Sequence, residues 1–131
     1  MYFPSFYSKK KKGSLSKLRS GKSLVYSRNI PKTDRIWKFS NPNVSQKRSF
    51  KYLGKKRGKI YRSTNKNKKY MIYDNIHNRY VYFGQMEYED FTKHKDKNRR
   101  KNYLTRSSKI RGNWKKNPFS PNNLSRKILW N

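Results

Sequence analysis

The chain has 131 residues, which leaves room for one small domain, and a 31% hydrophobic content is low for a self-sufficient globular core. An aromatic content of 16% argues against simple disorder, because disordered segments are poor in aromatic residues. The formal net charge of +30 predicts an acidic partner, since self-repulsion of this size opposes compaction.

Several functional classes are disfavoured by what the sequence lacks. Cysteine is absent, which excludes disulfides and thiolate metal sites, and only two histidines are present. No apolar run approaches the roughly 20 residues that span a bilayer. No nucleophile motif is recognisable. We therefore expect no enzyme, no cofactor or metal, no small-molecule substrate and no membrane-spanning segment.

Residues 1–56 are predicted to form an extended basic arm. An uncharged aromatic start precedes Lys9, Lys10, Lys11 and Lys12, which suits either a hook that plugs a partner's pocket or a frayed terminus. From residue 13 to 43 the large residues are isolated and show no helical period, so we expect them to anchor the arm in a partner. The predicted partner anchors are Phe3, Phe6, Tyr7, Trp37 and Phe39.

A second basic concentration follows between residues 44 and 69, where Phe50, Tyr52 and Tyr61 are interleaved with the cations. This mixture is typical of a surface for single-stranded nucleic acid, and it equally fits a solvated arm on an acidic protein. The residues predicted to contact an anionic surface or nucleic acid are Lys9, Lys10, Lys11, Lys12, Lys47, Arg48, Lys51, Lys55, Lys56, Arg57 and Lys59.

Residues 57–131 are predicted to form a small α+β module. Residues 69–73 and 79–83 alternate as an antiparallel hairpin around a polar loop, and residues 59–63 supply a first strand. The module is thus a hairpin or three-stranded meander followed by two or three short helices. Both faces of the hairpin carry bulky residues, so we expect helices to cover one face and leave the other for a partner.

Two helix starts are readable in the module. Asp96 is a good N-cap for a helix to about Arg106, and Ser120 precedes Pro121 at a first helical position. We expect Trp130 to pack on the hairpin or on Trp114, with a partner as the alternative. The predicted module core is Tyr70, Ile72, Tyr82, Phe83, Phe91, Tyr103, Leu104, Trp114, Leu124, Ile128 and Trp130.

A longer pattern runs through this module. It reads Phe83–Gly84, then Tyr-x-Asp-Phe-Thr-x-His-Lys-Asp from Tyr88 to Asp96, then Arg99–Arg100, then Leu-Ser-Arg-x-x-Leu-Trp from Leu124 to Trp130. The pattern resembles an uncharacterised family of small basic proteins from large nucleocytoplasmic DNA viruses and some phages. The resemblance covers residues 70–130, leaves the arm outside, and implies a viral setting without an activity.

The first functional hypothesis is therefore a structural virion protein, of the minor capsid or cement type, located in the capsid shell at its inner face after synthesis in the host cell. Its partners would be the major capsid protein or other virion proteins, and the arm would extend over acidic surfaces. The alternative is a basic protein that binds and condenses or tethers viral DNA. A ribosomal protein of an AT-rich organelle is a third interpretation.

Overall fold

The structure, a computed structural model, describes residues 24–131. The helices and strands in chain order are η2 (Ser27–Asn29), η3 (Arg35–Lys38), α1 (Pro42–Leu53), β1 (Ile60–Arg62), β2 (Lys68–Asp74), β3 (Arg79–Gln85), α2 (Phe91–His94), α3 (Lys97–Ser108), η4 (Trp114–Lys116), α4 (Pro121–Leu124) and η5 (Ser125–Leu129). The elements η2, η3 and η4 are short 3₁₀-helices, whereas η5 is a π-helix. The predicted α+β class is confirmed.

The three strands form an antiparallel meander in the order β1-β2-β3. The register pairs Ile60 with Ile72 and Ile72 with Val81, so these three branched residues form one row across the sheet. Tyr70 pairs with Phe83 on the same face. Because side chains alternate between the two faces of a strand, this row defines the face that meets the helices. The predicted hairpin and first strand are therefore confirmed.

The core draws on residues 30–53, on the sheet with Met86, and on residues 119–129. Tyr70, Ile72, Phe83, Leu124 and Ile128 are buried as predicted, and Trp130 packs partly buried against them. The other predicted core residues are half-buried and lie outside the buried cluster: Tyr82, Phe91, Tyr103, Leu104 and Trp114. The cluster also contains residues that the sequence analysis missed: Ile30, Ile36, Leu53, Ile60, Val81, Met86, Phe119 and Leu129.

The extended conformation expected for residues 24–56 is wrong. This segment contains α1, which begins at the N-cap Asn41 with Pro42 in its first turn, and it contributes Ile30 and Ile36 to the core. Two predicted partner anchors, Trp37 and Phe39, pack against that core instead of standing free for a partner. Isolated apolar residues are enough to bring this segment into the core, because the sheet supplies the rest of the core.

The helix α1 docks through polar side chains. The Gln46 Oε1 accepts hydrogen bonds from Ser27 Oγ at 2.7 Å and from the Ile60 backbone N–H at 2.9 Å. The Gln46 Nε2 and the Ser49 Oγ both donate to the Gly58 carbonyl, at 2.8 and 2.6 Å. Gln46 and Ser49 are completely buried. A helix held in this way has no apolar stripe, and this explains why its period was not visible in the sequence.

The C-terminal residues close the core beside β3. Ser120 caps α4 by accepting from the Asn123 N–H, with Pro121 following it, as predicted. The π-helix then buries Ile128 and Leu129. Gly84 has a φ of +82°, and a Cβ there would lie 2.8 Å from Leu129 Cδ1, so only glycine lets the strand and the π-helix approach this closely.

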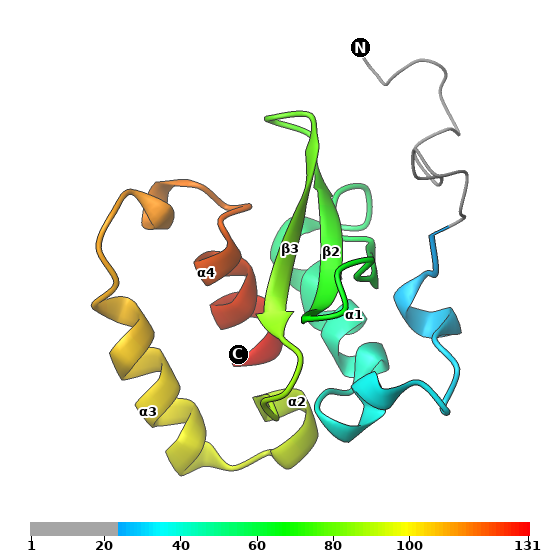
Figure 1. The fold of residues 1–131 in the computed structure, drawn as a ribbon. Coiled ribbons are helices and arrows are strands. Elements are labelled where there is room, and N and C mark those ends of the chain that lie inside the picture. The colour runs from blue at the N-terminus through cyan, green and yellow to red at the C-terminus, as the bar shows by residue number, and fades with distance from the viewer. Residues whose placement is uncertain (1–23) are drawn as a thin grey trace.

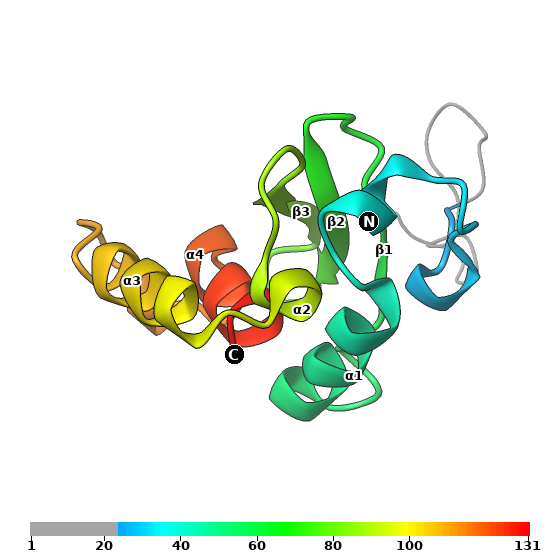
Figure 2. The ribbon, with the colours of Figure 1, turned by 90° about the horizontal axis from the view of Figure 1, so that it is seen from below.

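The helices differ in their distance from the sheet. In Figure 1, α1 lies behind the β2–β3 hairpin, α4 lies beside β3, and α3 is the outermost helix. Figure 2, the view from below, again shows α3 at the outer end with α4 between it and the sheet. The helix α3 is thus attached to the edge of the fold.

Candidate nucleic-acid interface

A cleft of about 700 Å³ separates α3 from the sheet. One wall is α3, the opposite wall is the end of the β2–β3 ladder around Lys68 and Gln85, and residues of α4 and η5 lie between them. Phe83, Leu129 and Trp130 give the cleft an apolar base. This combination of an apolar base with a few polar groups is typical of ligand sites.

The side of α3 that lines the cleft is polar and cationic. Its lining residues are Arg99, Asn102, Tyr103 and Arg106, which are spaced three, four and seven positions from the first. This spacing places them on one face of a helix. The helix buries one residue, Ser107. A packed helix usually carries leucines on its inward face. At these positions α3 carries two guanidinium groups and an amide, which line the cleft.

The sequence gives α3 a defined start. The Asp96 carboxylate caps it by accepting from the backbone N–H groups of Asn98 at 2.9 Å and Arg99 at 3.2 Å, as predicted. A carboxylate at this end also favours the helix dipole. Asp96 forms no ion pair with Arg99 or Arg106.

A small set of contacts holds α3 at its distance from the sheet. Tyr103 stacks on Trp130 with ring centroids 4.3 Å apart and an interplanar angle of 8°. The Arg126 guanidinium donates to the Leu104 carbonyl at 2.7 Å, and the Asn122 amide donates to the Ser107 carbonyl at 3.1 Å. Trp130 therefore contacts α3 in addition to the core cluster that contains the hairpin residues. Packing on the hairpin or on Trp114, or on a partner, was predicted, and the contact with α3 was not.

The opposite wall is fixed by a buried ion pair. The Lys69 Nζ lies 3.2 Å from the Asp90 Oδ2, both side chains are nearly inaccessible, and Lys69 also donates to the Tyr88 carbonyl. Burial lowers the pKa of Lys69, and the charge of Asp90 opposes that shift. Since the pair binds the connector after β3, it positions Tyr88 at the cleft with its side chain 67% exposed.

One acidic side chain, Glu89, lines the cleft. Its Oε1 lies 3.4 Å from the Arg99 Nη1, and both side chains are substantially exposed, at 40% and 49%. An ion pair of this exposure contributes little to stability and is readily screened. Lys68 and Arg106 have no acidic partner within residues 24–131, so the cleft keeps an excess of positive charge.

The predicted contact residues that the structure describes lie outside the cleft. Lys47, Arg48 and Lys51 lie on α1, and the others lie in the turn after it; all are exposed except the half-buried Arg48. None of these seven, from residue 47 to 59, has an ion-pair partner in the described chain. Lys9, Lys10, Lys11 and Lys12 and the predicted anchors Phe3, Phe6 and Tyr7 lie outside the described residues.

The polar residues that line the cleft were not predicted from the sequence. Lys68, Gln85, Asn102, Arg106 and Asn122 come from three distant segments, and no local pattern links them. One signal in the sequence could have indicated the cleft. The helix predicted after Asp96 has few apolar residues, so most of its basic surface has no element to cover it.

Two further observations limit the chemistry of the described residues. Across residues 24–131, no group of three His, Cys, Asp or Glu side chains could hold a metal ion. The helices of the same segment are too short and too polar for any of them to cross a bilayer.

Part of the chain matches a known protein family. Residues 58–107 match the model of a family of unknown function, DUF5754. The matched residues include β1, β2, β3 and α2, and all of α3 except its last residue. The chain is therefore similar to this family over the sheet and the basic helix, which form two walls of the cleft. Neither the curated proteins nor the solved structures yield a match.

Proposed function

We propose that this protein binds nucleic acid, with the phosphate backbone held at the cleft between α3 and the sheet. The observation that supports this most strongly is the face of α3 that lines the cleft, because Arg99, Asn102 and Arg106 replace the apolar residues of a packed helix. Guanidinium groups are suited to phosphate oxygens, which they bind through paired hydrogen bonds.

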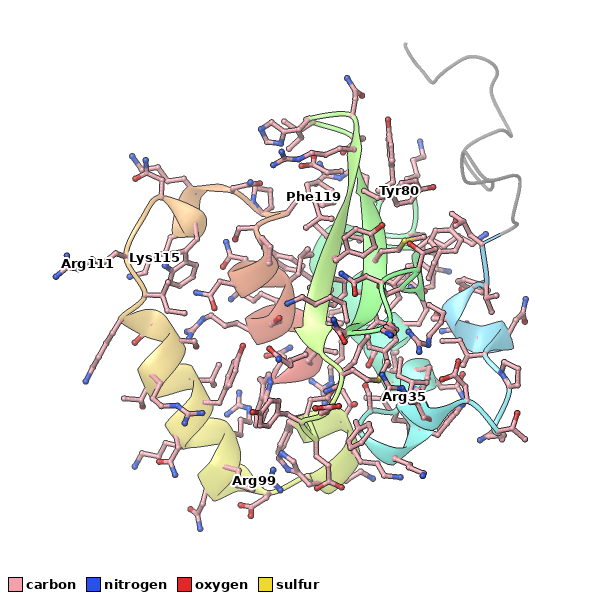
Figure 3. All side chains as sticks on the ribbon, in the orientation of Figure 1. Arg35, Tyr80, Arg99, Arg111, Lys115 and Phe119 are labelled. Atoms are coloured by element: carbon pink, nitrogen blue, oxygen red, sulfur yellow. The ribbon has the colours of Figure 1, made fainter. Side chains whose placement is uncertain are left out.

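The charge around the cleft supports the same proposal. Residues 93–116, which include α3, contain eleven Lys or Arg and a single acidic residue, the cap Asp96. Figure 3 shows Arg111 and Lys115 at the outer end of this segment, away from the sheet. A duplex or strand that crosses α3 would meet cations along its whole length, and the counterions it releases would favour binding.

The proposal is tested by a matched pair of double variants. Arg99→Ala/Arg106→Ala removes two charges from the cleft, whereas Arg35→Ala/Lys38→Ala removes two exposed charges from η3. Figure 3 shows Arg35 on the other side of α2 from α3. Affinity for a fluorescent DNA strand is measured between about 50 and 200 mM salt.

The cleft variant should bind about tenfold or more weakly and should lower the slope of log affinity against log salt by about 2. The η3 variant should keep most of the affinity and most of the salt slope. Equal losses in the two variants would mean that net charge alone attracts DNA and that the cleft has no special role.

A structural role in a virion stays a second proposal. The seven cations from Lys47 to Lys59 stand apart from the cleft, so an acidic protein surface could occupy them while the cleft holds nucleic acid. The packing of Trp37 and Phe39 in the core removes two of the anchors on which this role depended.

Fractionation of gently disrupted virions separates the two roles. Recovery with the major capsid protein after nuclease treatment and moderate salt would favour the shell. Recovery with the genome, lost on nuclease treatment, would favour nucleic-acid binding.

A further inference from the structure

The face of the sheet opposite the core carries five tyrosines around one methionine. We call it the tyrosine face, and its residues are Tyr26, Tyr61, Tyr73, Tyr80, Tyr82 and Met71. Met71 pairs with Tyr61 on one side and Tyr82 on the other, and Tyr73 pairs with Tyr80. Tyr26 adds an isolated bridge to Tyr61 at the edge of β1.

The tyrosine face is distinct from the core. Met71 is fully buried but does not belong to the core cluster, which is consistent with its two tyrosine neighbours closing over it. Each of the five tyrosines is half-buried. Figure 3 shows Tyr80 and the core residue Phe119 on opposite sides of the hairpin.

Side chains on this face contact one another in pairs. The rings of Tyr73 and Tyr80 are 5.2 Å apart at 69°, and those of Tyr26 and Tyr61 are 6.4 Å apart at 63°. The Tyr82 hydroxyl lies 3.0 Å from Thr64 Oγ1 in the loop before β2. Figure 2 shows α1, α2 and α4 together on one side of the sheet.

The two faces differ in chemistry as well. On the core face the sheet uses Ile60, Ile72, Val81 and Phe83 with a single tyrosine, Tyr70. On the other face both cross-strand partners of Met71 are tyrosines, Tyr61 and Tyr82. A tyrosine side chain has an apolar ring and a hydroxyl that can stay hydrogen-bonded to water. This face therefore suits a flat, polar and hydrated ligand better than another apolar core.

The charge of the surroundings specifies the ligand further. The Lys59 Nζ lies 4.7 Å from the Tyr26 ring centroid and 5.8 Å from that of Tyr61. The acids nearest in sequence are engaged elsewhere, Asp34 with Arg62 and Asp74 with His77. The face thus combines stackable rings with unneutralised cations, which matches a ligand that has flat rings and negative charge.

We propose that the tyrosine face binds the unpaired bases of single-stranded nucleic acid, with Lys59 at the phosphates. This goes beyond the proposed function, because it adds a second surface and concerns bases, which a duplex hides. Base stacking on aromatic side chains is tolerant of sequence, so we expect a preference for single strands without strong sequence preference.

The first test uses the full chain and changes the ligand. Oligothymidylate of about 12 nucleotides is compared with an abasic strand of equal length, which keeps the phosphates and lacks the bases. The wild-type protein should bind the abasic strand about tenfold or more weakly. Equal affinity for the two strands would overturn the tyrosine face while leaving the phosphate cleft standing. No binding of either strand would overturn both proposals.

The second test locates the bases. Tyr61→Leu/Tyr73→Leu should reduce the preference for oligothymidylate over the abasic strand, whereas Tyr61→Phe/Tyr73→Phe should keep it, because phenylalanine still stacks. Arg99→Ala/Arg106→Ala should weaken both strands equally and leave the preference unchanged.

Photocrosslinking of 5-iodouracil strands to the wild-type protein locates the bases even if the leucine variant fails to fold. Crosslinks should map to Tyr61, Tyr73 or Tyr82. Crosslinks to Tyr88 or Tyr103 in the cleft, or exclusively to residues 1–23, would overturn the proposal.

Discussion

The helices α1 and α3 have the same length, twelve residues, and both begin at a capping Asn or Asp, yet the fold uses them differently. The helix α1 buries five residues, three of them polar and hydrogen-bonded, whereas α3 buries only Ser107. Both helices are basic, so charge does not decide which of them joins the core. What decides is whether the inward side chains find partners: Gln46 and Ser49 do, and Arg99 and Arg106 face an open cleft.

The largest effect is expected from breaking the polar docking of α1. Gln46→Ala removes the partner of the Ser27 hydroxyl and of the Ile60 N–H in a buried site, and it removes one of the two donors to the Gly58 carbonyl. We expect the free energy of unfolding to fall by about 3 kcal/mol, as measured by urea unfolding. Lys47→Ala on the exposed side of α1 is the control and should change it by less than about 0.5 kcal/mol. A small effect of Gln46→Ala would show that α1 is held by something else.

A smaller and more local effect is expected on α3. Tyr103→Ala removes the stack on Trp130 and should cost about 1 kcal/mol. Because α3 lies at the edge, its amide protons should exchange faster while those of α1 keep their protection, as hydrogen exchange measures residue by residue. Lys101→Ala, exposed on the same helix, should leave the exchange unchanged. Equal acceleration in α1 would contradict an independently attached α3.

High pH should act on both helices in the same direction. Burial raises the pKa of Tyr52 in α1 and of Tyr103 in α3, and also that of Tyr70 in the core. Unfolded tyrosines ionise near pH 10, so above about that pH the unfolded state has lost protons that the folded state retains. The free energy of unfolding should therefore fall as pH rises past that value.

The pKa of Lys69 is lowered in the fold, so its titration makes the free energy of unfolding rise with pH. Lys69 is a single group, whereas several tyrosines act in the other direction. Urea unfolding at about pH 8 and pH 11 gives the pH dependence, and Tyr52→Phe and Tyr103→Phe should each make it shallower. A wild-type stability that did not decline would rule out the buried hydroxyls as its source.

The smallest effect concerns His94, the last residue of α2. Burial and the nearby Arg99 lower the pKa of His94, and its Nδ1 accepts a hydrogen bond from the Asp96 N–H at 2.8 Å. As pH falls below about 6.5, the unfolded state binds the proton first, so stability declines. The decline between about pH 7 and pH 5 should be smaller in His94→Gln than in wild type. Parallel curves would exclude His94 as its cause.

How far the sequence predicts this fold depends on whether the information is local. Asp96 and the Ser120–Pro121 pair indicate helix starts, and alternating residues indicate the hairpin. These elements are predictable because each signal lies within a few positions of the sequence. Asn41–Pro42 carries the same start signal, but the helix after it buries Ser45, Gln46 and Ser49, so its period is invisible to hydrophobicity.

The candidate sites depend on information that is not local. From the sequence alone, an isolated apolar residue can be an anchor for a partner or part of a core, as with Ile36, Trp37 and Phe39. Only their packing in the folded structure distinguishes these two roles. The cleft requires Lys68, Arg106 and Asn122 to converge from separate segments. The tyrosine face was partly foreseen, because both sides of the hairpin carry bulky residues.

The closure of the core by Leu124, Ile128 and Leu129 has a consequence for biosynthesis. The sheet is complete in sequence by Gln85, but its apolar face gains these residues only after some forty more have been translated. During that interval the nascent chain exposes a hydrophobic sheet that carries a large positive charge and emerges next to ribosomal RNA. Mutual repulsion between nascent copies, rather than early burial, would then protect the chain from aggregation until residue 129 arrives.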